Sequence, residues 1–346
     1  MTARARMRIK LLLNSGFSGL HAWFFLAQER GYFRDAGLEV EFIAGGGAAA
    51  VIPLIGRNGI DAGFGDMSAL AERVAYEPQS APIAVFAMFN APPFTIAVRA
   101  DSAIHHATDL AGCTIAGHAQ DAALKLFPAL ANAAGIAVDG VTVTPSSAGL
   151  GDQVRDLLLG GRVDGVFGFV NTIIAALAPL GIDPARLRFI NYADLLPDLY
   201  SNSLMASRDL IARAPDHVRA LVHGLNRGLI DTLADLDAGI EAVYRAAPAT
   251  DRAVQRRRLV GTLNAEMAHP EGATIGIGDI DDARLVRAIA LLARCGGLAA
   301  GSGPARGIYA GASAGGFAQG EGSGHMTQVR GIRNRDEGRR FVASTV

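Results

Sequence analysis

The sequence predicts an α/β fold of two similar Rossmann-like lobes, joined by two crossovers, with a ligand cleft between them. The main observation is an internal repeat, in which Ile60-Asp61-Ala62-Gly63-Phe64-Gly65 returns as Val163-Asp164-Gly165-Val166-Phe167-Gly168, about 103 residues later. Each copy follows a Gly-Arg pair, and the strands expected at 8–12 and 40–43 have counterparts at 113–116 and 141–143. The repeat is longer than the roughly 20–50 residues of solenoid or propeller units, so it indicates two facing lobes.

Strand and helix signals alternate, which favours βαβ units and largely parallel sheets. In the first lobe we expect strands at 8–13, 38–43, 61–64 and 83–89, and helices at 20–29, 45–55 and 68–76. The strand at 83–89 has few polar positions, so we expect it at the centre of its sheet. Asn90-Ala91-Pro92-Pro93 then interrupts the pattern. Because proline lacks a backbone donor, this segment is the expected first crossover.

The second lobe is expected to span 94–202, with helices at 119–134, 151–159 and 171–180. Residues 204–207 then return to the first lobe, which takes 1–93 and 203–298. Pro215 is expected to begin a long helix, because a stripe with a period of 3.6 residues follows it. This stripe consists of Val218, Leu221, Val222, Leu225, Leu229 and Leu233.

Asp237 is expected to cap the next helix, and 281–294 to form the last one. Residues 299–346 are rich in Gly and Ser and show no apolar period, so we expect this tail to be largely disordered.

Composition argues against several functional classes. The 346 residues are 50% hydrophobic and 19% charged, and the net charge of −1 leaves no basic stripe for nucleic acid. No apolar run approaches the roughly 18 residues of a membrane-spanning helix. Residues 1–8 are basic, but the apolar run after them is too short for a secretory leader. The chain is therefore either cytoplasmic or a mature chain without its leader. Cys113 and Cys295 fall in different expected lobes and are predicted to be free thiols.

Four segments resemble one known family. The segment 31–40, Gly-Tyr-Phe-Arg-Asp-Ala-Gly-Leu-Glu-Val, resembles the GYF-x-x-x-GL-x-V signature of the NMT1/THI5-like (SsuA/ThiY-like) solute-binding proteins. These proteins serve ABC importers for nitrate, sulfonates, taurine and pyrimidine precursors of thiamine. The other segments are 45–47, 59–65 and 109–116, and the last resembles the strand that enters the family's second lobe. The resemblance covers about 8–298 and implies the periplasmic-binding-protein type II fold.

The resemblance also implies a function. It indicates a periplasmic receptor that closes on a small organic solute and passes it to the permease of an ABC importer. We expect a monomer without cofactor, metal or catalytic residues. Family members that bind pyrimidines carry a Trp six residues before a His that matches His21, and this chain has Ser15 in that place. The chain therefore departs from the pyrimidine-binding pattern.

Two other functions stay open. The first is a pyrimidine-precursor synthase on the same fold, whose pyridoxal cofactor needs a lysine that binds it covalently. The chain has only Lys10, in an expected strand, and Lys125, one turn into an expected helix, and neither precedes a recognisable phosphate cup. The second is the ligand-sensing module of a regulator, but no helix-turn-helix precedes Arg8 in this sequence.

Ligands of open α/β sheets bind beyond the carboxyl ends of the strands, where loops lead into helix N-termini. Five segments fit this rule: 14–18, 45–47, 66–68, 117–121 and 169–172. The predicted ligand-binding residues are Asn14, Ser15, Phe17, His21, Gly46, Gly47, Asp66, Met67, Asn90, Gly117, His118, Gln120, Asp121, Phe169 and Asn171. We rank the loop 117–121 first, because the repeat makes it the counterpart of 14–18.

Several of these residues have two compatible roles. Phe17 offers a stacking face, and Asp66 can accept a hydrogen bond from an amino group of a ligand. Ser18, Asp66 and Asn171 can also cap the helices that follow them. The glycines 45–47 allow either close approach of the backbone to a ligand or only a tight turn. His21 is either a ligand contact or a histidine satisfied within the fold.

Charged ligands and metals have fewer candidates. Arg99 and Arg155 are candidates for an anionic ligand, and both are expected at the surface. His105-His106 lies in a loop outside the expected cleft. Since no cysteine or third carboxylate stands at ligand spacing, no metal site is predicted.

Overall fold

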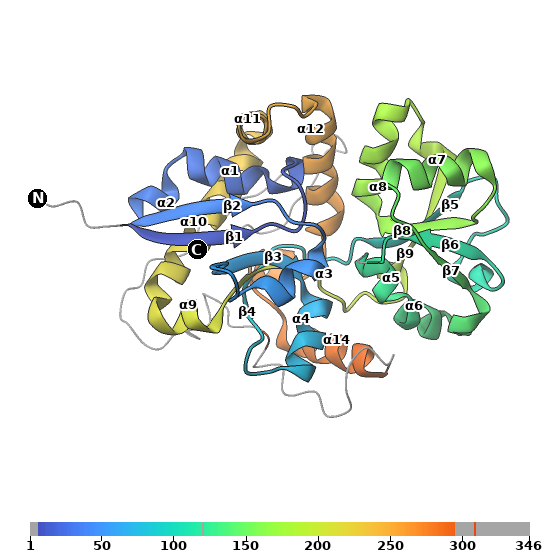
Figure 1. Ribbon diagram of the computed structural model, residues 1–346, viewed down its shortest axis with the longest axis horizontal. Coiled ribbons are helices and arrows are strands. Elements are labelled where there is room, and N and C mark those ends of the chain that lie inside the picture. Colours follow the sequence, from blue (N-terminus) through green and yellow to red (C-terminus); the bar gives the residue numbers. More distant parts are fainter. Residues whose placement is uncertain (1–5, 120, 295–307, 309–346) are drawn as a thin grey trace, which may run out of the picture.

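A computed structural model describes residues 6–119, 121–294 and 308, which form two five-stranded sheets with helices around each (Figure 1). The first sheet has the order β2-β1-β3-β10-β4 and the second β7-β6-β8-β5-β9. The predicted fold class is confirmed. Gln120, Cys295 and, apart from Ile308, the predicted tail lie outside the described residues. We call the elements around each sheet the first and second lobes, and the domain boundaries at 93/94 and 202/203 stay a prediction.

The strands of the first sheet are β1 (Met7–Leu12), β2 (Leu38–Ile43), β3 (Ala62–Asp66), β4 (Ile83–Ala87) and β10 (Asn202–Ala206). Those of the second are β5 (Phe94–Arg99), β6 (Thr114–Gly117), β7 (Thr142–Pro145), β8 (Gly165–Phe169) and β9 (Leu187–Asn191). The repeated segments occupy equivalent positions, because β1, β2 and β3 match β6, β7 and β8 in the two strand orders. The repeat extends to hydrogen bonding. The carboxylate of Asp61 accepts from the backbone N–H of Lys10 at 3.1 Å, and that of Asp164 from Thr114 at 2.8 Å.

The helices of the first lobe are α1 (Ala22–Glu29), α2 (Tyr32–Asp35), α3 (Ala48–Val51), α4 (Met67–Tyr76), α9 (Arg208–Arg213), α10 (Pro215–Ala234), α11 (Leu236–Ala246), α12 (Arg252–Gly261), α13 (Gly272–Ile275) and α14 (Asp282–Arg294). Those of the second are α5 (Ala122–Lys125), α6 (Phe127–Ala134), α7 (Leu150–Gly160) and α8 (Val170–Leu177). A π-helical turn, Thr262–Glu266, continues α12. The predicted stripe of α10 is buried from Val218 to Leu229. None of the described helices is both long enough and apolar enough to cross a membrane.

Two expectations about the fold are wrong, and the expectation of largely parallel sheets holds with one exception in each sheet. β10 and β5 each run antiparallel to both of their neighbours, and the other four strands of each sheet run in one direction. The strand expected at the centre, β4, lies at an edge, where Ala87 pairs with Gly278 and the N–H of Ala84 donates to Ile308. Gly278 and Ile308 thus cover the outer edge of β4, so this edge strand can be as apolar as a central one. Asp235, not Asp237, caps α11 by accepting from the N–H of Ala238 at 3.0 Å.

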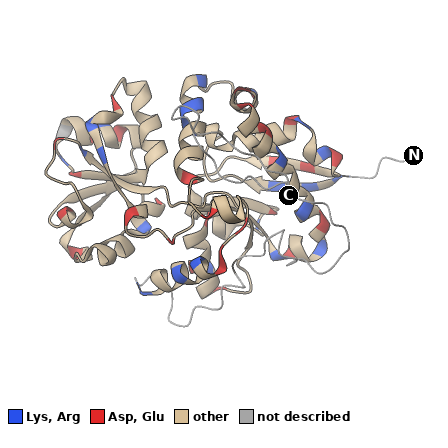
Figure 2. Ribbon diagram, turned by 180° about the vertical axis from the view of Figure 1, so that it is seen from behind, with Lys and Arg blue, Asp and Glu red and all other residues tan. Residues whose placement is uncertain are grey.

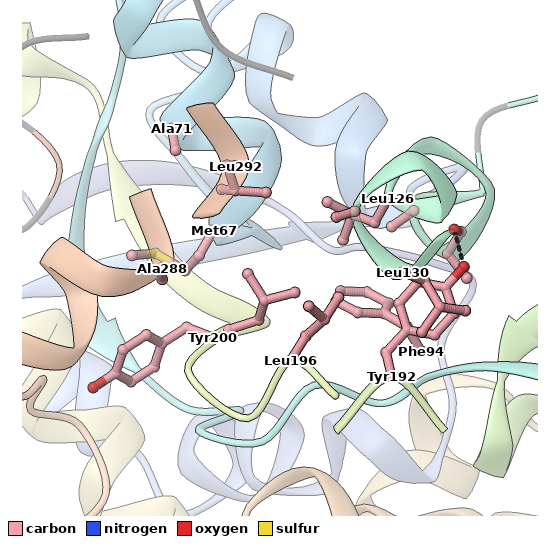
Figure 3. Close-up of a cluster of buried hydrophobic side chains, with 14 of the residues drawn as sticks. Met67, Ala71, Phe94, Leu126, Leu130, Tyr192, Leu196, Tyr200, Ala288 and Leu292 are labelled. Carbon is pink, nitrogen blue, oxygen red and sulfur yellow. Dashed lines mark hydrogen bonds between the residues drawn. The ribbon is translucent and has the colours of Figure 1, made fainter. Parts of the chain in front are cut away.

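The two lobes contact each other on both sides of their boundary. In Figure 1, α12 of the first lobe lies beside α8 of the second. The two helices are close at Gly261, where an added Cβ would lie 1.9 Å from Oδ1 of Asn171. On the other side, α14 and α4 face α6 across an apolar cluster, which includes Met67, Leu126 and Leu292 (Figure 3). Over most of the described ribbon, Lys and Arg alternate with Asp and Glu, while α12 carries four arginines and no acidic residue (Figure 2).

Two crossovers join the lobes, and the Arg284 side chain of α14 binds both. It is 2% exposed. Its guanidinium donates to the carbonyl of Asn90 in the first crossover at 2.7 Å. It also donates to the carbonyls of residues 197, 198 and 199 in the second crossover, at 3.0, 3.2 and 2.9 Å. Its Nη1 lies 2.8 Å from Oε2 of Glu271, and the group stacks over the Tyr200 ring at 4.0 Å.

Arg284→Met should therefore destabilise the fold strongly, by about 3–5 kcal/mol, because it leaves the largely buried Glu271 carboxylate without its counter-ion and four carbonyls without their donor. Urea denaturation followed by circular dichroism measures the change. The matched control is Arg287→Met one turn on, which removes only a surface pair with Asp198 and should leave the midpoint almost unchanged. Equal effects of the two substitutions would contradict the role of Arg284.

Candidate functional site

A pocket with a volume of about 270 Å³ opens where the two lobes meet. The first lobe contributes Ala49 of α3, Asp66 and the face of α4 that carries Ser68, Ala69 and Glu72. The second lobe contributes Ala122, Lys125 and Leu126, and Leu292 of α14 completes the wall. Figure 3 shows Leu126 and Leu292 on opposite sides of the space next to Met67. The pocket thus combines apolar walls with charges from both lobes.

Asp66 ends β3 and caps α4 inside this pocket. Its Oδ1 accepts from the backbone N–H groups of Ser68 and Ala69, both at 3.0 Å, so the helix cap predicted from the sequence is formed. Its Oδ2 is buried and has no hydrogen-bond partner among the described residues. Burial raises the pKa of Asp66 to about 6. The helix N–H groups and, more weakly, the Lys125 ammonium of the other lobe lower it and so offset part of the rise.

A second set of polar residues lies around the junction of α12 and α8. His21 is fully buried, and its Nε2 lies 2.7 Å from Oδ1 of Asn14. Because a carbonyl oxygen only accepts, Nε2 carries the proton, and Nδ1 is left as a buried acceptor without a partner in the described part of the chain. Burial, aided by the nearby Arg258 charge, lowers the pKa of His21 to about 3, so the ring is neutral.

Glu266 connects this set to the second lobe. Its Oε1 accepts from Nδ2 of Asn171 at 3.1 Å, across the lobe boundary. Its Oε2 is buried and has no hydrogen-bond partner among residues 6–119, 121–294 and 308. Burial raises the pKa of Glu266 to about 7, although Asn171, Thr262 and the Arg258 guanidinium oppose the shift. Burial in turn lowers the pKa of Arg258.

The structure brings some of the predicted site residues together and separates others. Asn14 and His21 are bonded to each other, and Asn171 reaches Glu266. Asp66 faces the pocket, while Met67 beside it is buried in the apolar cluster. Asn90 lies in the first crossover, where its Oδ1 accepts from the N–H of His269 at 3.1 Å.

Four further predicted residues have mainly structural contacts. Phe17 packs edge-on against Phe25, with ring centroids 4.9 Å apart, and Phe169 packs against Phe94 at 5.3 Å. The hydroxyl of Ser15 donates to the carbonyl of its neighbour Gly16 at 3.2 Å. An added Cβ on Gly117 would lie 2.9 Å from the Phe167 ring, so this glycine is required by close packing.

The rest of the predicted loops lie at the lobe boundary or the surface. Gly46 is exposed, with open space around its Cα, and Gly47 precedes α3 with φ = 143°. His118 is exposed, and Asp121 caps α5 through the N–H of Ala123 at 2.7 Å, with its pKa raised by burial. Arg99 and Arg155 form exposed pairs with Asp101 and Asp152. Ligand binding by the predicted residues stays a prediction.

Sequence reasoning missed Glu72 of α4 as a pocket residue, and Arg258 and Glu266 as residues at the lobe boundary. Nothing local marks Arg258 and Glu266, because α12 and its π-helical turn contact α8 only through the tertiary fold. Lys125 was considered only as a cofactor lysine. Asp121 belongs to the loop that we ranked first, and Lys125 follows this helix cap by one turn. This spacing is the signal that could have placed Lys125 in the pocket wall.

Known proteins share this architecture. The periplasmic aliphatic sulphonate-binding protein SsuA of Escherichia coli is 14% identical, with a TM-score of 0.64 over 96% of this chain and 99% of that one. The alkanesulfonate-binding protein SsuA of Xanthomonas axonopodis, bound to MOPS, is 17% identical, with a TM-score of 0.62 over 89% and 99%.

A curated relative with a different activity also matches. The 4-amino-5-hydroxymethyl-2-methylpyrimidine phosphate synthase of Legionella pneumophila is 21% identical over 244 residues, which are 70% of this chain and 75% of the relative. Residues 19–238 match the family described as NMT1/THI5 like. The match covers more than half of the chain and contains all four segments on which the resemblance was based, so the protein belongs to the NMT1/THI5-like family.

Proposed function

We propose that this protein is the solute-binding component of an ABC importer and that it acts outside the cytoplasmic membrane. It holds a small organic molecule, such as a sulfonate or a heterocycle, between its lobes and presents it to the permease as a monomer. The observation that carries this proposal is the pocket between α4 and α5, whose wall comes from both lobes and holds a buried, unsatisfied carboxylate oxygen. The two sulfonate-binding proteins of the same fold support it.

Binding would act through closure of the lobes. A molecule in the pocket touches α4 on one side and α5 on the other, so it gains its full set of contacts only when the lobes are together. The Asn171–Glu266 hydrogen bond adds a direct contact between the lobes in this arrangement. A ligand of this kind favours the closed state over the open state. The free energy of this shift equals the difference between its binding free energies for the two states.

A second candidate is a pyrimidine-precursor synthase, and two observations favour it. A distant relative has that activity, and Lys125 lines the pocket. The pocket suits a pyridoxal phosphate group poorly, however, because Lys125 is the one cation among the nine lining residues, and a covalent bond from Lys125 to the cofactor would leave no cation in the wall for the phosphate. We therefore rank the binding protein first.

The solute-binding proposal predicts that gently purified protein retains its ligand. Native mass spectrometry should show a mass above that of the polypeptide, which is lost on unfolding. In thermal-shift screening with sulfonates, pyrimidines and aromatic acids, a true ligand at 100 times its Kd should stabilise the fold by about 2.7 kcal/mol. The proposal would be contradicted if the native mass equals that of the polypeptide alone and no compound of the panel raises the melting temperature.

Glu266→Gln should change how stability depends on pH. The folded-state pKa of Glu266 lies near 7, above the unfolded value of about 4.5, so the folded state binds the proton more tightly. The contribution of this group is therefore full below about pH 4.5 and is lost as pH rises to about 7. Glutamine keeps the acceptor for Asn171 without the charge. The variant should match the wild type at pH 4.5 and be more stable by roughly 1–3 kcal/mol at pH 8.

Urea denaturation of the ligand-free protein at the two pH values measures this difference. His21 and Asp66 titrate in both proteins, so their contributions cancel in the comparison. Identical pH dependence of wild type and Glu266→Gln would show that the Glu266 carboxylate is not desolvated in the folded protein.

The two candidate functions differ in the behaviour of Lys125. If the chain is a binding protein, it should form no covalent adduct between Lys125 and pyridoxal phosphate. Mixing the two should then give no absorbance band near the visible edge that depends on Lys125. Lys10→Arg, in β1 and outside the pocket wall, is the matched control. A stable band that Lys125→Arg removes and Lys10→Arg keeps would reverse the ranking of the two functions.

A further inference from the structure

Asp66 has more charge than its structural role needs. As a helix cap it uses only Oδ1, and asparagine or serine would make the same bonds to the N–H groups of Ser68 and Ala69 without a buried charge. Leaving Oδ2 buried without a partner costs free energy, because the oxygen has lost its water. The residue lines the pocket at an exposure of 1%, so the missing donor has to be a small group, such as an N–H, that reaches the carboxylate from the pocket.

The other residues of the pocket wall indicate the size and charge of that molecule. Five of the nine lining residues are alanine or leucine, which suits the carbon skeleton of an organic molecule. The volume of about 270 Å³ is just below the usual range of ligand pockets, about 300–1,000 Å³, so the molecule is small. The charged residues of the wall are two carboxylates, Asp66 and Glu72, and one ammonium, Lys125, so their sum is negative. This balance favours a ligand group that is positive or donates hydrogen bonds.

We propose that the solute carries an amino group whose N–H donates to Oδ2 of Asp66, and that Asp66 selects aminated molecules over their amine-free analogues. This inference rests on the solute-binding function proposed above and specifies its ligand class. The α4 amides hold Oδ1, so the carboxylate cannot turn away from the ligand without losing the cap.

Asp66→Asn tests the proposal with little risk to folding, because asparagine caps helices as well as aspartate does. Its oxygen keeps the bonds to the α4 amides, and its NH₂ then points to where Oδ2 was. The substitution thus replaces an acceptor by a donor in the pocket at nearly constant shape. Asp235→Asn is the matched control, since Asp235 caps α11 through the N–H of Ala238, is exposed and does not line the pocket.

The ligands are paired probes that differ by one amino group: 2-aminoethanesulfonate and ethanesulfonate, 4-amino-2-methylpyrimidine and 2-methylpyrimidine, and 4-(aminomethyl)benzoate and 4-methylbenzoate. Dissociation constants are measured by isothermal titration calorimetry. In the wild type, at least one aminated probe should bind more than tenfold tighter than its partner. Asp66→Asn should weaken that probe about 10- to 100-fold, the effect of losing one charge-assisted hydrogen bond, and so abolish the preference. Asp235→Asn should change neither constant more than about twofold.

Three outcomes overturn the inference. If the members of each pair bind the wild type equally, the amino group is not recognised, although the solute-binding function stands. If Asp66→Asn weakens both members of a pair alike, Asp66 acts only on the shape of the cleft. If no probe binds the wild type, and thermal-shift screening with the broader panel is also negative, both the inference and the proposed function fail.

Discussion

One buried guanidinium holds together the two chain segments that connect the lobes. The crossovers are irregular backbone, so their carbonyl groups have no partners in a helix or sheet, and burying them requires donors from elsewhere. Arg284 supplies several of these donors from a single planar group, which lysine could not do with the same geometry. Because one side chain binds both crossovers, they cannot move independently. The positions of α4 and α5, and hence the pocket between them, depend on this contact.

Buried polar atoms without hydrogen-bond partners occur both at the crossovers and at the lobe boundary. At the crossovers, the charge of Arg284 is matched by Glu271, whose Oε2 also accepts from the Tyr200 hydroxyl at 2.9 Å, while Nδ2 of Asn90 and Oε1 of Glu271 lack partners among the described residues. At the lobe boundary, Nδ1 of His21, Oδ2 of Asp66 and Oε2 of Glu266 are buried without partners in the same described part of the chain. Since each such atom lowers stability, a fold selected only for stability would have replaced them. The position of the second set along the lobe boundary agrees with a surface kept for a ligand.

Much of the fold could be predicted because its cause is local. The repeated segments place β3 and β8 correctly, since both copies consist mostly of the small and apolar residues of a buried strand. The position of β4 could not be predicted, because its edge is covered by residues near 278 and 308, far away in sequence. The cap of α11 was misplaced by two residues, since Asp235 and Asp237 are both acceptable caps and only backbone geometry decides between them. Glu266 and Arg258 needed the tertiary structure, because no motif connects them to Asn171 or His21.

Asp66 and Glu266 show why buried carboxylates at one lobe boundary can have different roles. Burial raises the pKa of both. Glu266 already has a partner in the other lobe, Asn171, so part of its desolvation is offset whenever the lobes are together, with or without a ligand. Asp66 is bonded only to amides of its own lobe, which hold it equally well however the lobes are arranged. Lobe closure alone therefore satisfies Glu266 in part and leaves Oδ2 of Asp66 as it was. By this argument Glu266 favours the closed arrangement, and discrimination between solutes is left to Asp66.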